Sequence, residues 1–134
     1  PISLRKGPIA IFPKNKKVKN FFNKIGTTIE IKDEKLSKNF WTISGTMASF
    51  YELLNVLTNW LIKEKVNKRD AQKYVTHLYS ALAQLAVSNT SKPLKYLVEE
   101  QTPGGLNWQG VNELRKLGYY RLLEKSLKKI YKRL

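Results

Sequence analysis

Two long helical patterns, separated by only two residues, constrain this chain more than any other feature. Apolar residues recur at helical spacing over residues 47–65 and again over residues 68–87. Side chains three and four positions apart share one face of a helix. The two apolar stripes consist of Phe50, Leu53, Leu54, Leu57, Trp60 and Leu61, and of Ala71, Val75, Leu78, Leu82 and Leu85. We therefore predict a mostly α-helical domain built around these two helices.

This helix pair also bears on the oligomeric state. The pair is broad enough to bury two faces, and Ala81, Ala83 and Ala86 are small enough to let another helix approach closely. Two-fold dimers are the most common soluble oligomers. We therefore expect an interlocked homodimer, with a compact monomeric bundle as the alternative.

The first 32 residues follow a different pattern. Residues 9–12 and 27–31 are short, apolar or β-branched runs that indicate strands, and residues 14–24 have helical spacing. A strand, a helix and a second strand are typical of a parallel crossover. Two strands alone make a poor sheet. We therefore expect this segment to be the end of a larger α/β domain.

From Asp33 onward the chain is predicted to be helical. A break is expected at residues 44–46, and Pro93 suits the first position of a short helix. Two closing helices are predicted over residues 108–116 and 119–134, divided by Gly118.

A turn interrupts this helical region before the closing helices. It consists of Thr102, Pro103, Gly104, Gly105, Leu106 and Asn107, and we refer to it as the 102–107 turn. The two glycines remove side chains that would block an approaching ligand. The first N–H groups of the following helix lack intrahelical partners and lie at the positive end of its dipole. The turn therefore suits a carboxylate or phosphate, although Pro and Gly are also common in plain interhelical turns.

The charge and the reactive residues exclude several classes of site. The formal net charge is +15, but the cations are mostly lysines spread along the chain, as on solvated faces. They follow no zinc-finger or RNA-recognition pattern, so we do not expect a nucleic-acid partner. The chain has no cysteine and a single histidine, His77, inside a helical pattern. We therefore expect no metal site.

The apolar runs predict a location away from membranes. None approaches the roughly 18 residues needed to cross a bilayer, and residues 1–17 lack the apolar core of a signal peptide. We expect a cytoplasmic protein. The first residue is Pro1 rather than methionine, which suggests a fragment or a processed product.

The order of these elements resembles the carboxyl-terminal dimerisation domain of pyrroline-5-carboxylate reductases. On this resemblance, residues 1–32 are the tail of a dinucleotide-binding α/β domain, and residues 33–134 form the helical dimerisation and substrate-carboxylate-binding domain. The fold class implied is a helical dimerisation bundle preceded by a short strand–helix–strand remnant.

Two motifs carry the resemblance. The family's Gly-Ser-Gly-Pro-Ala-Tyr segment corresponds to residues 45–50, which keep the first glycine, a hydroxyl and an aromatic residue. The family's Ser/Thr-Pro-Gly-Gly turn is matched at residues 102–105, but Leu106 and Asn107 replace its following pair of small residues. A glutamate near the pyrroline nitrogen in many members corresponds to Thr90. The resemblance implies a substrate-binding set of Thr46, Thr102, Gly104, Gly105, Leu106 and Asn107.

The implied activity is hydride transfer from NADPH or NADH to a cyclic imine, which gives proline. The family's Gly-x-Gly-x-x-Gly fingerprint is absent from these residues, so we expect it upstream of Pro1, where it would bind NADP or NAD. The chain alone is then expected to be inactive. We nominate no residue as a general acid. Glu99 and Glu100 are neighbours on a predicted short helix, where they fit a solvated face.

Several interpretations stay open at this point. The chain could serve a divergent imine or keto reductase, or a dimerisation scaffold, or a basic helical module that binds nucleic acid. The choice between NADPH and NADH, and any assembly beyond a dimer, are also open.

Overall fold

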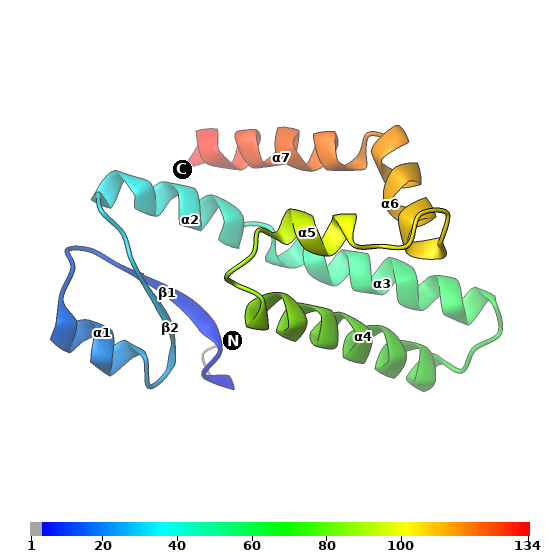
Figure 1. Ribbon diagram of the computed structural model, residues 1–134, viewed down its shortest axis with the longest axis horizontal. Helices are drawn as coiled ribbons and strands as arrows, with labels where there is room; N and C mark the ends of the chain where they lie inside the picture. The colour runs from blue at the N-terminus through cyan, green and yellow to red at the C-terminus, as the bar shows by residue number, and fades with distance from the viewer. Residues whose placement is uncertain (1–3) are drawn as a thin grey trace. The chain divides into compact units, whose positions relative to one another are not determined.

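The computed structural model describes residues 4–134. Its elements are β1 (Gly7–Ile11), α1 (Lys16–Phe22), β2 (Gly26–Glu30), the 3₁₀ helix η2 (Glu34–Leu36), α2 (Ser37–Ser44), α3 (Met47–Lys63), α4 (Lys68–Ser88), α5 (Leu94–Glu99), α6 (Leu106–Lys116) and α7 (Tyr119–Arg133) (Figure 1). The predicted fold class, mostly helical with an N-terminal strand–helix–strand segment, is confirmed.

The chain divides into two compact units. The first contains the residues up to Thr46 together with Ser126–Leu134, and the second is Met47–Lys125. We describe each unit by itself. The domain boundary expected after residue 32 stays a prediction.

In the first unit, β1 and β2 form a parallel two-stranded sheet. The register pairs Gly7 with Gly26 and Ile11 with Glu30. A side chain at position 26 would collide with the carbonyl oxygen of Gly7, so this close approach requires glycine. The predicted first strand begins at Gly7, before the apolar run, because pairing with Gly26 extends it to that residue.

Helix α1 supplies the crossover between the strands. The Asn15 side chain caps the helix by accepting hydrogen bonds from the backbone N–H groups of Lys17 and Val18, at 3.0 and 3.1 Å. The Lys19 ammonium donates to Glu30 Oε2 at 2.8 Å and ties the helix to β2. This hydrogen bond holds the pKa of the Glu30 carboxyl below its ordinary value.

The end of α7 packs along α2 in the same unit. Lys38 Nζ lies 4.3 Å from the centre of the Tyr131 ring, a cation–π distance. Thr42 is buried, and its hydroxyl donates to the Lys38 carbonyl at 2.8 Å. A Cβ on Gly45 would lie 3.1 Å from Ile130 Cγ2, so the last residues of the chain complete this unit.

The second unit is built on the antiparallel pair α3 and α4 (Figure 1). Asn67 Oδ1 caps α4 by accepting from the N–H of Arg69 at 2.9 Å. Ala71 and Val75 are the buried residues of α4. Both belong to the predicted stripe. Ala71 is completely buried, and its small side chain allows close helix packing.

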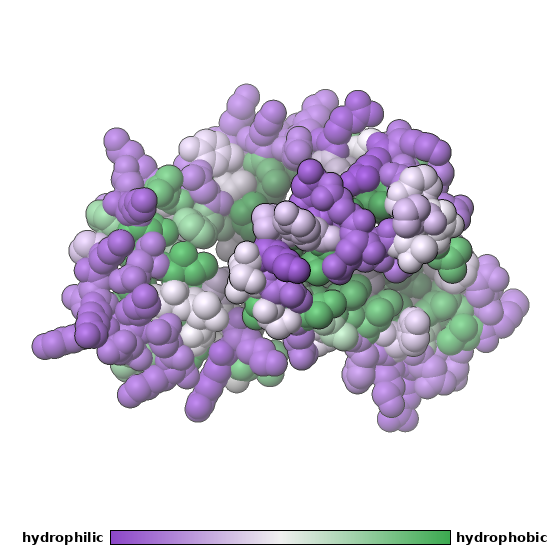
Figure 2. All heavy atoms as spheres, viewed as in Figure 1, coloured by the Kyte–Doolittle hydropathy of each residue, from purple (hydrophilic) through white to green (hydrophobic). Residues whose placement is uncertain are grey.

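Much of the remaining stripe is uncovered within a single chain. The side chains of Trp60, Leu82 and Leu85 are 60%, 50% and 50% exposed. Figure 2 shows hydrophobic side chains at the surface over α3 and α4. Burial of apolar area is the dominant favourable term in folding and association, so these faces are available for a partner.

Candidate functional site

The 102–107 turn joins α5 to α6 through two glycines with different conformations. Gly104 has a φ of +77°, in the left-handed region that favours glycine. No other atom lies within 4 Å of the position that a Cβ on Gly104 would take. Gly105 has a φ of −74° and a ψ of 167° and is the N-cap residue of α6. One side of the turn is therefore open at Gly104.

The start of α6 has no side-chain cap, because glycine occupies the capping position. The first helical hydrogen bond runs from the N–H of Gln109 to the Gly105 carbonyl at 2.9 Å. Within residues 4–134, the preceding N–H groups of Leu106, Asn107 and Trp108 have no acceptor. Such groups, at the positive end of a helix dipole, bind anions.

The side chains that follow the glycines differ in their surroundings. Leu106 is 86% exposed. Asn107 Nδ2 donates to Gln101 Oε1 at 2.9 Å. Gln101 Nε2 in turn donates to the Leu97 carbonyl at 2.8 Å. Sequence reasoning missed Gln101, because only the folded turn brings its amide to Asn107.

Thr46, the remaining predicted substrate-binding residue, belongs to the first unit and lies just before α3. Its hydroxyl donates to the Ile43 carbonyl at 2.7 Å and closes the last turn of α2. The structure therefore brings together Thr102, Gly104, Gly105, Leu106 and Asn107 in one turn of the second unit. The role of Thr46 stays a prediction.

Thr90 lies after α4 and is exposed. It lines a shallow hollow of about 390 Å³ with Ala86, Val87, Lys92 and Leu94. None of these lining residues is an aspartate or a glutamate, so the hollow offers no carboxylate where many family members have a glutamate.

The sequence profile described as pyrroline-5-carboxylate reductase dimerisation matches residues 34–134. The chain belongs to this family. A search of curated proteins finds no match.

Solved structures from the same family share the fold. A pyrroline-5-carboxylate reductase from Coxiella burnetii has a TM-score of 0.80 and 19% identity, covering 98% of this chain and 52% of that one. The Plasmodium falciparum pyrroline carboxylate reductase with NADP bound has a TM-score of 0.77 and 19% identity, covering 99% and 56%. The Streptococcus pyogenes 1-pyrroline-5-carboxylate reductase has a TM-score of 0.78 and 20% identity, covering 98% and 54%. The chain thus spans about half the length of these reductases.

The strand-to-helix connections of the first unit lack the glycine-rich turn of a dinucleotide site. Residues 12–15 and 31–33 contain no glycine. The Asn15 and Asp33 side chains occupy the N–H groups that follow them. A nucleotide pyrophosphate needs a glycine-rich turn whose N–H groups are free. The described residues also contain no group of three or more His, Asp or Glu that could hold a metal ion.

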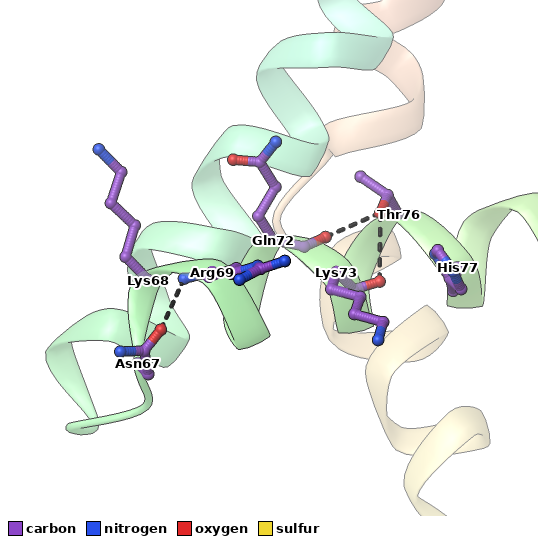
Figure 3. Close-up of a pocket in the computed structure, with 7 residues that line it drawn as sticks. All are labelled: Asn67, Lys68, Arg69, Gln72, Lys73, Thr76 and His77. Carbon is purple, nitrogen blue, oxygen red and sulfur yellow. Dashed lines mark hydrogen bonds between the residues drawn. The ribbon is translucent and has the colours of Figure 1, made fainter.

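A basic hollow of about 660 Å³ lies at the start of α4 (Figure 3). Two of its polar side chains bind the backbone of α4: Asn67 Oδ1 accepts from the N–H of Arg69 at 2.9 Å, and the Thr76 hydroxyl donates to the Gln72 and Lys73 carbonyls at 2.8 and 3.1 Å. Figure 3 shows Lys68 and Lys73 pointing in different directions. The hollow therefore has the character of a solvated helix face. Its lining residues are Asn67, Lys68, Arg69, Gln72, Lys73, Thr76 and His77.

Across residues 4–134, no helix combines the length and the apolar character needed to cross a membrane.

Proposed function

We propose that this chain is the substrate-binding and dimerisation portion of an NAD(P)H-dependent pyrroline-5-carboxylate reductase-like enzyme, which reduces a cyclic imine to proline. The observation that carries the proposal is the uncapped start of α6, where Leu106, Asn107 and Trp108 have N–H groups without acceptors. Membership of the pyrroline-5-carboxylate reductase dimerisation family supports the assignment.

In this proposal the turn binds the substrate carboxylate. The N–H groups at the start of α6 donate to its oxygens, and the Thr102 hydroxyl and Asn107 amide supply further donors. Hydrogen bonds to a charged acceptor are stronger than those between neutral groups. Holding the carboxylate in this way fixes the orientation of the imine ring, which lowers the entropic cost of the reaction.

NADPH or NADH would supply the hydride in such an enzyme. The Plasmodium falciparum relative has NADP bound, which supports this class of cofactor. We propose that the cofactor is bound mainly by a dinucleotide-binding domain upstream of these residues, and we assign its binding to no residue of this chain.

A second copy of the chain would cover the exposed apolar faces of α3 and α4. The surface available to this partner includes Trp60 and an apolar hollow of about 760 Å³. The hollow is lined mainly by Leu61, Val66, Tyr74 and Leu78. The family description, which names dimerisation, supports a homodimer. Assembly beyond a dimer and the cytoplasmic location stay predictions.

Two measurements test this function. Sedimentation velocity of the chain should give a dimer, and a monomer at all concentrations would contradict the proposed assembly. The encoded protein that contains this chain should oxidise NADPH or NADH when pyrroline-5-carboxylate is added. Absence of turnover with either cofactor would contradict the proposed activity.

A further inference from the structure

Gln101 spans the 102–107 turn with one side chain. Its Nε2 donates to the Leu97 carbonyl in α5 at 2.8 Å, and its Oε1 accepts from Asn107 Nδ2 in α6 at 2.9 Å. The last turn of one helix is thus connected to the first turn of the next.

The first of these bonds sets the direction of the second. Leu97 lies in the last turn of α5, where backbone carbonyls lack intrahelical partners. A carbonyl oxygen can accept a hydrogen bond but cannot donate one. Gln101 must therefore direct its NH₂ group to the Leu97 carbonyl and its Oε1 to Asn107. Asn107 must then direct its own NH₂ group to Gln101.

This arrangement leaves Asn107 with one unused donor. An amide NH₂ group carries two hydrogens, and Gln101 Oε1 accepts one of them. The other stays available in the first turn of α6, beside the N–H groups that have no acceptor. Without Gln101 the Asn107 amide would be free to reverse and present its oxygen, which repels a carboxylate.

We propose that Gln101 is a positioning residue that fixes the Asn107 amide as a hydrogen-bond donor for the substrate carboxylate. The inference rests on the function proposed above. It also assigns a role to Asn107, which stands where the family's turn has a small residue.

The test measures the dissociation constant of L-proline, and that of L-prolinamide, which lacks the carboxylate, on the full chain. Gln101→Met should weaken L-proline binding about three- to tenfold, the range expected for the net loss of one hydrogen bond. L-prolinamide affinity should stay unchanged, since a positioning role acts on the carboxylate alone. Gln109→Met, the same change one turn into α6 at a side chain outside this network, is the matched control and should leave both constants unchanged.

A double-mutant cycle isolates the pair. If Gln101 acts through Asn107, Gln101→Met should have no further effect in an Asn107→Ala background. Equal effects in both backgrounds, or equal weakening of L-proline and L-prolinamide, would overturn the inference while leaving the proposed function intact.

A measurement on the unmodified chain covers the case in which Gln101→Met fails to fold. The side-chain amide NMR signals of Asn107 and Gln101 should shift together when L-proline is added. If backbone signals at the start of α6 shift while these two do not, the inference is wrong and the carboxylate site stands. If L-proline shifts none of them, both the inference and the carboxylate site are wrong.

Discussion

The backbone N–H of Gly105 donates to the carbonyl of Thr102 at 2.9 Å. This bond closes the turn. The next three N–H groups, those of Leu106, Asn107 and Trp108, belong to the first turn of α6. It also gives the two glycines different roles. Gly104 is needed for its left-handed backbone, whereas Gly105 keeps a side chain away from Thr102.

Gly104→Ala should destabilise the chain by about 1 kcal/mol, because an L-residue is disfavoured at a φ of +77°. Urea unfolding measures the change. Gly110→Ala is the control, since it lies within α6 with open space around it. It should stabilise the chain by about 0.5–1 kcal/mol, as alanine favours helix. The same sign for both changes would contradict the assigned conformation.

Gly105→Val should abolish L-proline binding without dissociating the dimer. A Cβ at Gly105 lies 3.0 Å from the Thr102 carbonyl oxygen, so a valine forces Thr102 away from the start of α6 and distorts the turn that presents the N–H groups. Calorimetry and sedimentation velocity give the two readouts. Gly110→Val, the same change in open space, should keep affinity. Unchanged L-proline affinity in Gly105→Val would show that the turn is only structural.

Ala71→Leu should destabilise the second unit by about 1–3 kcal/mol, because overpacking a completely buried position forces α3 and α4 apart. The midpoint of urea unfolding measures the loss. Gln72→Leu, at an exposed position on the solvated face of the same helix, should change stability little. Equal effects at both positions would show that the α3–α4 contact at Ala71 is wrong.

Glu30→Gln should lower stability more at pH 7 than at pH 3. Lys19 lowers the pKa of Glu30 in the folded chain below the ordinary value of 4.5. The ion pair therefore stabilises the fold above that value, and its contribution is lost as the pH falls through the lowered pKa. Urea unfolding at both pH values gives the comparison. Glu99→Gln, at the exposed pair with Lys95, should show a smaller change, and a pH-independent effect of Glu30→Gln would contradict the prediction.

The local features of the fold could be predicted from the sequence. Two apolar stripes, the second of which contains Ala71 and Val75, predicted the two central helices, because helical periodicity depends only on spacing. The Pro-Gly-Gly turn indicated an anion site, since glycine leaves the backbone N–H groups uncovered.

Long-range and side-chain details could not be predicted in this way. The position of Lys38 over Tyr131 joins residues far apart in the sequence, and no local pattern specifies it. The bond between Gln101 and Asn107 depends on the path of the turn between them. The apolar stripe that contains Trp60 predicted that this side chain is buried. Trp60 is exposed because no other part of the same chain covers it.

Backbone amide NMR of the chain during an L-proline titration tests the central claim most directly. The claim is that the start of α6 binds the substrate carboxylate. The amide signals of Leu106, Asn107 and Trp108 should shift most, and L-prolinamide should not reproduce the shifts. Shifts that spare these three residues, or that occur equally with L-prolinamide, would contradict it.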